Sequence, residues 1–284
     1  MEEDFSIRLY AKGPIFREGL TTKDALKVLY NFSEIYEYCI ERANNKFADG
    51  EQFIVDPQLK IEYIKNGSLS SLLFVDFPAA YAMIKPLING YSWGLFKESF
   101  KFVRSSIELI KTKNETPRVI VKDSPDAIVF VAGRDIVVPP SVFDVAKKKF
   151  ENISKLADSV SPGNALFLDM KKVGPNNKVL DKVKIDLASS EFYQLEPKEF
   201  VPEDEHEILC SIYKFNKRSL LGSLETEIDG TTRTFNFEAQ NGNISDYLES
   251  MKRERVKARV KQKLQVNAFG ERKIVYLYVT GLML

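Results

Sequence analysis

The chain has 284 residues and a formal net charge of +1, with 44% hydrophobic and 29% charged residues. This length suits two modest domains or one large one, and the composition excludes long disorder. A net charge near zero excludes a general electrostatic attraction to nucleic acid or membranes, so any such attraction must be local. Cys39 and Cys210 lie in apolar helix and strand patterns, which predicts buried reduced thiols and a cytoplasmic location.

The first residues of the chain and its most apolar stretch argue against a targeting peptide and a membrane span. The first residues, MEEDFSIRLY, are acidic and lead directly into a strand pattern, which predicts neither a signal nor a transit peptide. The most apolar stretch, residues 69–95, is interrupted by Asp76, Lys85, prolines and glycines. We therefore expect no transmembrane segment.

The chain opens with a strand pattern followed by a helix pattern. Residues 5–11 alternate in polarity, as a strand does. Thr21 and Asp24 form a capping box for a helix that runs to about Ala43. Further on, Asn66-Gly67 is a type I′ turn signal and predicts a hairpin over residues 59–77.

Two helices are expected next, at 79–87 and 95–111, separated by Pro86 and the glycines of residues 90–94. Aromatic residues crowd the 74–102 region. They are Phe74, Phe77, Tyr81, Tyr91, Trp93, Phe96, Phe100 and Phe102. Their helical spacing favours a core, and the alternative is an exposed patch that makes the chain a homo-oligomer.

The rest of the first domain mixes short strands with one helix. Residues 119–138 predict three strands, and a helix follows from Ser141, the expected cap, to about Val160. Residues 165–169 and 182–187 are further strand candidates. The fold class is therefore α+β, with an N-terminal mixed sheet domain over residues 1–194.

Proline and acidic residues mark 195–205 as a linker, and residues 206–284 follow as a small β module. Its predicted elements are strands at 206–215, 219–228 and 231–239, a helix at 244–253 capped by Asn243, and strands at 256–266 and 273–282. The order βββ-α-ββ predicts an antiparallel OB-like barrel, a fold that often binds oligonucleotides or other partners.

The sharpest local feature is a basic strand with the sequence RVKARVKQKLQV, residues 255–266. Alternate side chains of a strand share a face, so one face carries cations and the other apolar residues. The cations are Arg255, Lys257, Arg259, Lys261 and Lys263. Neighbouring cations on this face lie about 7 Å apart, close to the phosphate spacing of an extended single strand.

Aromatic residues of other strands are expected beside this row, where they would supply stacking rings for nucleic-acid bases. Tyr276 and Tyr278 are expected on the next strand, facing the same way. Phe235 and Phe237 are expected to do so on another strand.

Acidic residues weaken the case for nucleic acid. Glu225 and Glu227 are expected on a neighbouring strand, where they would neutralise the row. The basic strand therefore fits three interpretations: a solvated face, a docking surface for a protein partner, or a groove for single-stranded nucleic acid. The first two are favoured, because charge runs specify their partners weakly.

The sequence contains few combinations of residues that could form a catalytic site. His206 is the single histidine of the chain. It is therefore the only histidine that could take part in a metal site or in an acyl-transfer triad, which disfavours both. No nucleotide-binding glycine motif or paired CxxC occurs. We expect no catalytic residue, no metal and no cofactor.

One enzymatic alternative is a metal-dependent nuclease. Asp126 follows a proline before a strand, and Asp169 and Lys171 close the apolar run ALFL, loosely like a PD…(D/E)xK motif. In that chemistry two carboxylates hold Mg²⁺ and a lysine orients the attacking water. However, the gap is long, a helix intervenes, and Asp-x-Lys occurs by chance in charged proteins.

The helix sequence TTKDALKVLYNFSEIYEYCI, the hairpin sequence KIEYIKNGSLSS and the C-terminal β module together resemble a group of bacterial proteins. These proteins share an N-terminal α+β domain and a small C-terminal β-barrel. Some lie in mobile-element or defence gene neighbourhoods. The resemblance covers the order of elements over most of the chain and implies no activity and no functional residue.

We therefore expect a non-catalytic binding or scaffold component of an intracellular bacterial or phage assembly, with a defence-related role as one setting. In this interpretation the C-terminal module docks a protein partner through the basic strand. The alternatives are a single-stranded nucleic-acid-binding protein that uses residues 255–263 and the metal-dependent nuclease.

Overall fold

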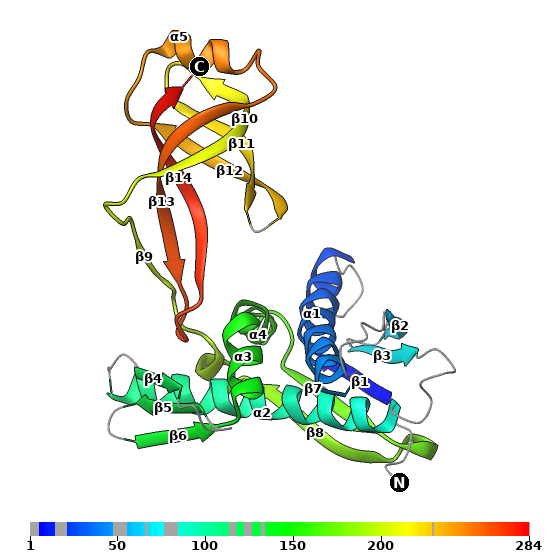
Figure 1. The fold of residues 1–284 in the computed structure, drawn as a ribbon. Helices are drawn as coiled ribbons and strands as arrows, with labels where there is room; N and C mark the ends of the chain where they lie inside the picture. The colour runs from blue at the N-terminus through cyan, green and yellow to red at the C-terminus, as the bar shows by residue number, and fades with distance from the viewer. Residues whose placement is uncertain are drawn as a thin grey trace. The chain divides into compact units, whose positions relative to one another are not determined.

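The computed structural model describes residues 6–14, 22–47, 56–65, 68–76, 85–113, 118–121, 127–131, 134–228 and 230–283. Their contacts divide the chain into two compact units, Met1–Glu196 and Pro197–Leu284 (Figure 1). Both helices and sheets are present, so the fold class is α+β. Among the described residues, no helix is both long enough and apolar enough to cross a bilayer.

The first unit is built on a five-stranded antiparallel sheet. Its strands are β1 (Ser6–Lys12), β2 (Asp56–Lys65), β3 (Ser68–Asp76), β7 (Phe167–Val173) and β8 (Val179–Asp186), in the order β2-β3-β1-β7-β8. Helix α1 (Thr22–Phe47) connects β1 to β2, with β3 lying between these two strands. Helix α2 (Lys85–Lys113) leaves β3 and leads, through an inserted segment, to β7 on the other side of β1. This is a split β-α-β arrangement.

Several predicted elements of this unit are confirmed. The first strand, the first helix and the hairpin correspond to β1, α1 and the β2–β3 pair. The two later strands correspond to β7 and β8. Asn66-Gly67, which suggested the hairpin, lies outside the described residues.

The predicted break between two helices near Pro86 is wrong, because α2 runs without interruption from Lys85 to Lys113. Pro86 is the second residue of α2, where a missing N–H leaves no helical hydrogen bond unmade. Gly90 and Gly94 each cost about 1 kcal/mol relative to alanine. The buried rings of the same helix offset this cost, since a buried aromatic side chain contributes about 1.5–3 kcal/mol.

Aromatic rings fill the core between α1 and α2. Phe96 lies at the centre, with its ring centroid 5.9 Å from Phe32, 5.6 Å from Tyr36 and 4.7 Å from Phe100. Trp93 stacks on Phe96 at 5.6 Å. Most rings of the 74–102 region whose side chains are described therefore belong to the core rather than to an exposed patch. The rings of Phe74, Phe77 and Tyr81 lie outside the described side chains.

The segment inserted between α2 and β7 contains a small sheet and two helices. Strands β4 (Arg118–Val121), β5 (Ala127–Val131) and β6 (Arg134–Val138) form the three-stranded sheet that the sequence predicted. Helices α3 (Pro140–Lys148) and α4 (Phe150–Asp158) replace the single predicted helix, with the break at Lys149. Short 3-10 turns follow at Pro175–Asn177 and Ser190–Tyr193.

Ser141 is not the cap of α3. The N-cap is Pro139, which offers no side-chain hydrogen bond. Proline is favourable just inside a helix start, so Pro140 can begin α3 without a polar cap. The Ser141 hydroxyl instead accepts a hydrogen bond of 3.1 Å from the hydroxyl of Tyr91 on α2.

A polar contact fixes which face of β8 meets α2. Trp93 Nε1 and Lys97 Nζ donate hydrogen bonds of 3.0 and 2.7 Å to Asp181 Oδ2. Burial alone would raise the pKa of Asp181, but these hydrogen bonds have the larger effect together. The pKa of Asp181 is therefore below its usual value. Val183 and Ile185, which share a face of β8 with Asp181, are buried on this side.

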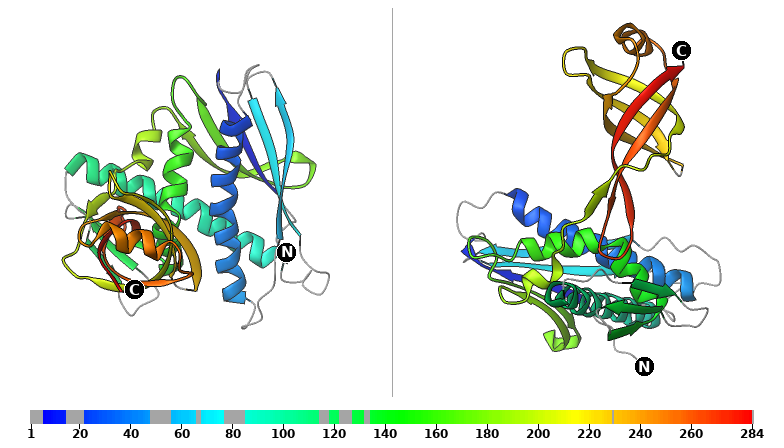
Figure 2. Two further views of the ribbon diagram at one scale, coloured as in Figure 1. Left: turned by 90° about the horizontal axis from the view of Figure 1, so that it is seen from above. Right: turned by 90° about the vertical axis from the view of Figure 1, so that its left-hand side faces the viewer.

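The second unit contains a closed five-stranded barrel, seen along its length in the left view of Figure 2. Its strands are β10 (His206–Asn216), β11 (Leu221–Ile228), β12 (Thr231–Ala239), β13 (Val256–Val266) and β14 (Arg272–Met283). They pair in the order β10-β11-β12-β14-β13, and β13 also pairs with β10, which closes the barrel. Helix α5 (Ile244–Ser250) connects β12 to β13, so the predicted βββ-α-ββ order is confirmed.

The expectation of an entirely antiparallel barrel is wrong, because β12 and β14 pair in parallel. The reason is the odd number of strands. Strands β12 and β14 are each two antiparallel steps from β10, so both must run in the same direction as β10. A closed barrel of five strands therefore needs a parallel pair.

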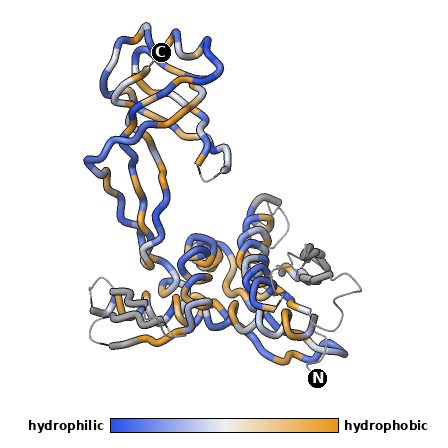
Figure 3. The backbone as a smooth tube through the Cα atoms, in the orientation of Figure 1, coloured by the Kyte–Doolittle hydropathy of each residue, from blue (hydrophilic) through white to orange (hydrophobic). Residues whose placement is uncertain are grey.

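Every second side chain of the barrel strands points into the barrel and fills its core. Figure 3 shows hydrophilic and hydrophobic residues alternating along these strands. Leu224, Phe237 and Val260 are among the residues with no exposed surface. Tyr247 of α5 closes one end of this core, stacking on Phe215 at 4.7 Å and donating its hydroxyl to the carbonyl of Asn241 at 2.9 Å. Asn243 caps α5 as predicted, because its side chain accepts a hydrogen bond from the Ser245 amide.

Part of the predicted acidic linker is structured. Residues Lys198–Phe200 form strand β9, which pairs with β13 at Leu264, Gln265 and Val266. Strand β9 belongs to the second compact unit. The segment therefore places an acidic residue, Glu199, directly beside the basic strand.

Gly222 of β11 tests the packing of the barrel. A Cβ at this position would lie 2.4 Å from the Phe237 ring and 2.6 Å from the Lys214 carbonyl oxygen. We expect Gly222→Ala to lower the free energy of unfolding of the barrel by about 1–3 kcal/mol, because the ring must shift in a closed core. Urea denaturation followed by circular dichroism measures the change. Gly281→Ala is the matched control, since nothing lies within 4 Å of its Cβ position, and an equal loss in both variants would contradict the prediction.

Both cysteines are free and buried, as the sequence predicted. Burial raises the pKa of the Cys210 thiol to about 11 and also raises that of Cys39. Both thiols are therefore protonated at neutral pH, and the reactive thiolate is scarce. In a titration with a chromogenic disulfide reagent at pH 8, we expect no rapid reaction in the folded protein and two reactive thiols after unfolding in denaturant. A rapidly reacting thiol in the folded protein would contradict this burial.

Candidate functional site

The basic strand contains the whole of β13 and the preceding Arg255, and its side chains alternate between the core and the outside. Val256, Ala258 and Val260 are buried in the barrel. Lys257 and Arg259 are exposed on the opposite face, and Lys261 and Lys263 are half-buried further along it. Arg255 is exposed and directly precedes the strand. The apolar residues thus hold the strand in place while the cations face outward.

The register between β13 and β14 brings the two predicted tyrosines to this row. Lys261 lies opposite Tyr278, and Lys263 lies opposite Tyr276. Residues opposite each other in an antiparallel pair project to the same face. The two tyrosine rings contact each other edge to face at 5.4 Å. We call the seven residues together the barrel face; they are Arg255, Lys257, Arg259, Lys261, Lys263, Tyr276 and Tyr278.

The two phenylalanines expected beside the row are elsewhere, so that prediction is wrong. Phe235 is 7% exposed and Phe237 is fully buried, and both point into the barrel core. The reason is the alternation of β12, whose inward positions are 235, 237 and 239. The outward neighbour at this end of β12 is Glu238, which is aligned with Tyr278 of β14.

The acids that meet the basic strand are not the predicted ones. Glu225 and Glu227 lie on β11, which pairs with β10 and β12 and not with β13. The acids come instead from β10 and β9, the strands that flank β13 on its other edge. Glu207 Oε1 lies 3.6 Å from Arg259 Nε, and Glu199 Oε2 lies 2.5 Å from Lys263 Nζ.

These ion pairs neutralise part of the row at a small energetic gain. The Arg259 and Glu207 side chains are 55% and 59% exposed, and a pair so open to solvent contributes at most about 1 kcal/mol. The hydrogen bond and charge of Glu199 raise the pKa of Lys263. Arg255, Lys257 and Lys261 form no ion pair with any residue that the structure describes.

Tyr276 of the barrel face is a neutral hydrogen-bonding group. Burial, the charge of Glu238 and the neighbouring Tyr278 all raise the pKa of Tyr276. Its hydroxyl therefore keeps its proton at physiological pH and can donate a hydrogen bond as well as accept one. The face as a whole offers fixed cations, two rings and flanking acids, and it contains no nucleophile beside a base.

The residues of the nuclease alternative are only partly described. Asp169 and Lys171 lie on the same face of β7, with Asp169 Oδ2 at 3.3 Å from Lys171 Nζ. Asp126 lies outside the described residues. Within the described part of the chain, no three Asp, Glu, His or Cys side chains gather as a metal site would require. Asp169 Oδ1 is shielded from solvent and accepts no hydrogen bond from a described residue.

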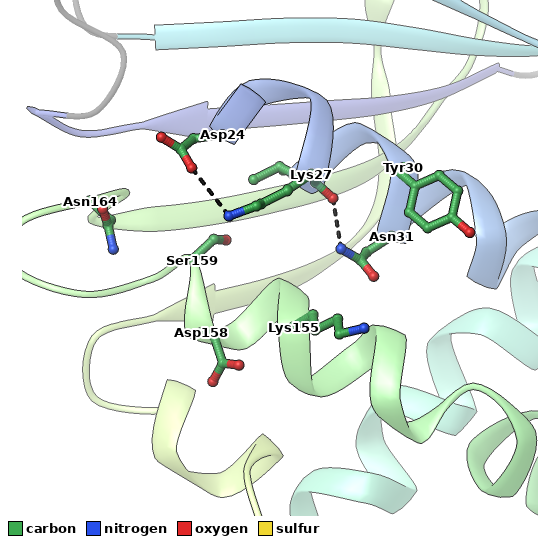
Figure 4. A pocket seen from close by; sticks show the side chains of 9 residues that line it. Asp24, Lys27, Tyr30, Asn31, Lys155, Asp158, Ser159 and Asn164 are labelled. Carbon is green, nitrogen blue, oxygen red and sulfur yellow. Dashed lines mark hydrogen bonds and ion pairs between the residues drawn. The ribbon is translucent and has the colours of Figure 1, made fainter. Parts of the chain in front are cut away.

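A surface pocket of about 430 Å³ lies between α1 and α4 in the first unit (Figure 4). Val28 and the buried side chain of Asn31 line its floor. Both polar atoms of the Asn31 side chain are already hydrogen-bonded, since Nδ2 donates to the Lys27 carbonyl and Oδ1 accepts from Asn152 Nδ2. Burial raises the pKa of Asp158 at the rim, although Lys155 partly lowers it.

The volume of this pocket falls within the range of small-molecule sites. However, the cations at its rim are already paired, Lys27 with Asp24 and Lys155 with Glu151, and both lysine side chains are more than half exposed. No pattern in the sequence indicated this pocket, because its walls come from segments more than a hundred residues apart. It offers few free polar groups with which to select a ligand.

Comparisons with models of protein families, with curated proteins and with solved structures found no match to this chain.

Proposed function

We propose that this protein is a non-catalytic binding component of an intracellular bacterial or phage assembly, whose C-terminal barrel docks an acidic protein partner through the barrel face. The observation that carries the proposal is the outward row of Arg255, Lys257 and Lys261, which form no ion pair with a described residue. Such cations on a rigid strand can attract and orient an acidic surface.

The surroundings of the row support a protein partner. Leu209 lies opposite Lys257 on β10 and is 48% exposed, so an apolar side chain adjoins the cations. Glu199, Glu207 and Glu238 interrupt the positive charge on either side. Alternating charges and apolar groups favour a partner of matching pattern and disfavour a uniform polyanion.

We also assign the barrel to the OB type. The third and fifth strands are adjacent and parallel, and a helix connects the third strand to the fourth. Barrels of this type often bind partners through the face of their second and third strands, here β11 and β12, and through connecting loops. This assignment supports a binding role for the barrel without identifying the ligand.

Charge reversal of the three unpaired cations tests the proposed docking. We expect the triple variant Arg255→Glu, Lys257→Glu and Lys261→Glu to lose a partner that the wild-type chain captures from a lysate of its host. Binding of the purified partner, measured by calorimetry, should weaken at least tenfold, because each reversal replaces attraction with repulsion. Capture is performed with and without nuclease, which separates a protein partner from a nucleic-acid bridge.

The triple variant Lys214→Glu, Lys217→Glu and Arg218→Glu is the matched control. It changes the net charge equally, and these residues are exposed around the β10–β11 turn rather than on the barrel face. Equal loss of binding in both triple variants would show a general charge effect and overturn docking through the barrel face.

A second candidate, single-stranded nucleic-acid binding by the same face, is favoured by the position of Tyr276 and Tyr278 opposite Lys263 and Lys261. Base stacking on aromatic rings beside cations is the common mode of such binding. We expect Tyr276→Ala with Tyr278→Ala to weaken binding of a labelled single-stranded oligonucleotide about tenfold in fluorescence anisotropy. Tyr213→Ala is the control, since Tyr213 is 50% exposed on β10 outside the barrel face. An absence of salt-sensitive binding at low ionic strength would exclude this candidate.

The metal-dependent nuclease stays a prediction. Asp169 and Lys171 are close together, but the remaining ligand it requires, Asp126, lies outside the described residues.

A further inference from the structure

The sheet of the first unit has an outer face, on the side away from α1 and α2, that carries cations and aromatic rings. The inward residues Leu9, Met170 and Ile185 have no exposed surface, so the alternate positions of β1, β7 and β8 face outward. The register places Tyr10 opposite Asp169 and Lys12 opposite Phe167. Strand β8 continues these rows with Lys182 and Lys184. We call this surface the outer sheet face.

Two aromatic rings lie at the centre of the outer sheet face, each beside a lysine. The rings of Tyr10 and Phe167 contact each other with centroids 5.9 Å apart. Lys171 Nζ lies 5.3 Å from the centre of the Tyr10 ring, and Lys184 Nζ lies 5.5 Å from that of Phe167. Neither ring is buried, in contrast to the core rings between α1 and α2. Half-exposed rings beside cations form a stacking platform rather than a packing layer.

Cations exceed acids on this face. The acids are Asp169 and Asp186, and each pairs with a lysine two residues away on its own strand, at 3.3 Å in both cases. Lys12 and Lys182 are exposed, and their ammonium groups form no ion pair with a described residue. Arg8 adds a further positive charge in the row of Lys171 and Lys182. The surplus of positive charge disfavours contact with the same face of a second copy and favours a polyanion.

We propose that the outer sheet face binds single-stranded nucleic acid, with bases stacked on Tyr10 and Phe167 and phosphates held by Lys12 and Lys182. Lys12 and Lys182 lie two strands and two rows apart, on opposite sides of the row that contains Tyr10 and Asp169, so a single strand that crosses this row can reach both lysines. Half-exposed rings among cations suit unstacked bases, whereas a duplex hides its base faces. This surface is separate from the barrel face, and the inference does not depend on the proposed function.

The test measures anisotropy of a fluorescein-labelled, mixed-sequence single-stranded DNA or RNA of thirty nucleotides with the full chain, across a range of salt concentrations. The variant Lys12→Glu with Lys182→Glu should bind at least tenfold more weakly at low salt. Its log–log salt dependence should also be shallower by about 1.4, since each lost phosphate contact on a single strand removes about 0.7. The variant Tyr10→Leu with Phe167→Leu should bind about tenfold more weakly with an unchanged salt slope, because stacking releases no counterions.

Lys101→Glu with Arg104→Glu on the exposed side of α2 is the control for net charge, and it should retain wild-type binding to within about threefold. Thermal unfolding checks that each variant is folded, and the charge variant keeps the test decisive if the ring variant is unstable. The proposal is overturned if neither oligonucleotide binds at low salt. It is also overturned if the control weakens binding as much as Lys12→Glu with Lys182→Glu, or if only the triple variant of the barrel face weakens it.

Discussion

Both candidate surfaces exist because side chains alternate across a β-strand, so a strand that fills a core with every second residue must present the others outside. On β13, the inward residues Val256, Ala258 and Val260 complete the barrel and the cations between them face solvent. On β7, the inward residues Leu168 and Met170 pack beneath the helices, which leaves Asp169 and Lys171 on the outer sheet face. The buried half of each strand supplies the stability, and the exposed half is free to carry function.

Closure of the barrel fixes which residues of each strand face inward and which face outward. Strand β10 pairs with β11 on one edge and with β13 on the other, and each of the five strands is paired on both edges over part of its length, which fixes its register. A shift of one residue would place Lys257 and Arg259 in the core and Val256 and Val260 outside, and burying unpaired charges is far costlier than any surface contact could offset. The outward position of the cations is therefore as firmly determined as the core itself.

The predictions succeeded where the determinants are local and failed where they depend on which strands become neighbours. The period of two along residues 255–266 and the type of each barrel element depend on short sequence patterns, and both could be predicted. The acids beside the row could not, since Glu199 and Glu207 reach it only through the pairing of β13 with β9 and β10.

The same limit applies elsewhere in the chain. The sequence pattern suggested that Phe237 would face outward with the cations, but the inward register of β12 is set by the barrel. The unbroken α2 could not be foreseen from Pro86 and Gly90, because burial of Phe96 against α1, with Trp93 stacked on Phe96, outweighs local helix propensity. The outer sheet face gave no signal at all, since it exists only when β1 pairs with β7, about 160 residues further along the chain.

The two surfaces differ in where their acids lie, and this difference decides what each can recognise. On the outer sheet face, Asp169 and Asp186 pair with lysines of their own strands, and Lys12 and Lys182 form no ion pair with a described residue. On the barrel face, the acids come from three flanking strands and divide the positive row into short stretches. Separate unpaired cations can each hold a phosphate of one chain, whereas a positive row divided by acids favours a partner whose charges alternate to match. A chain of nearly zero net charge can thus hold two basic surfaces with different partners, because recognition depends on local charge order.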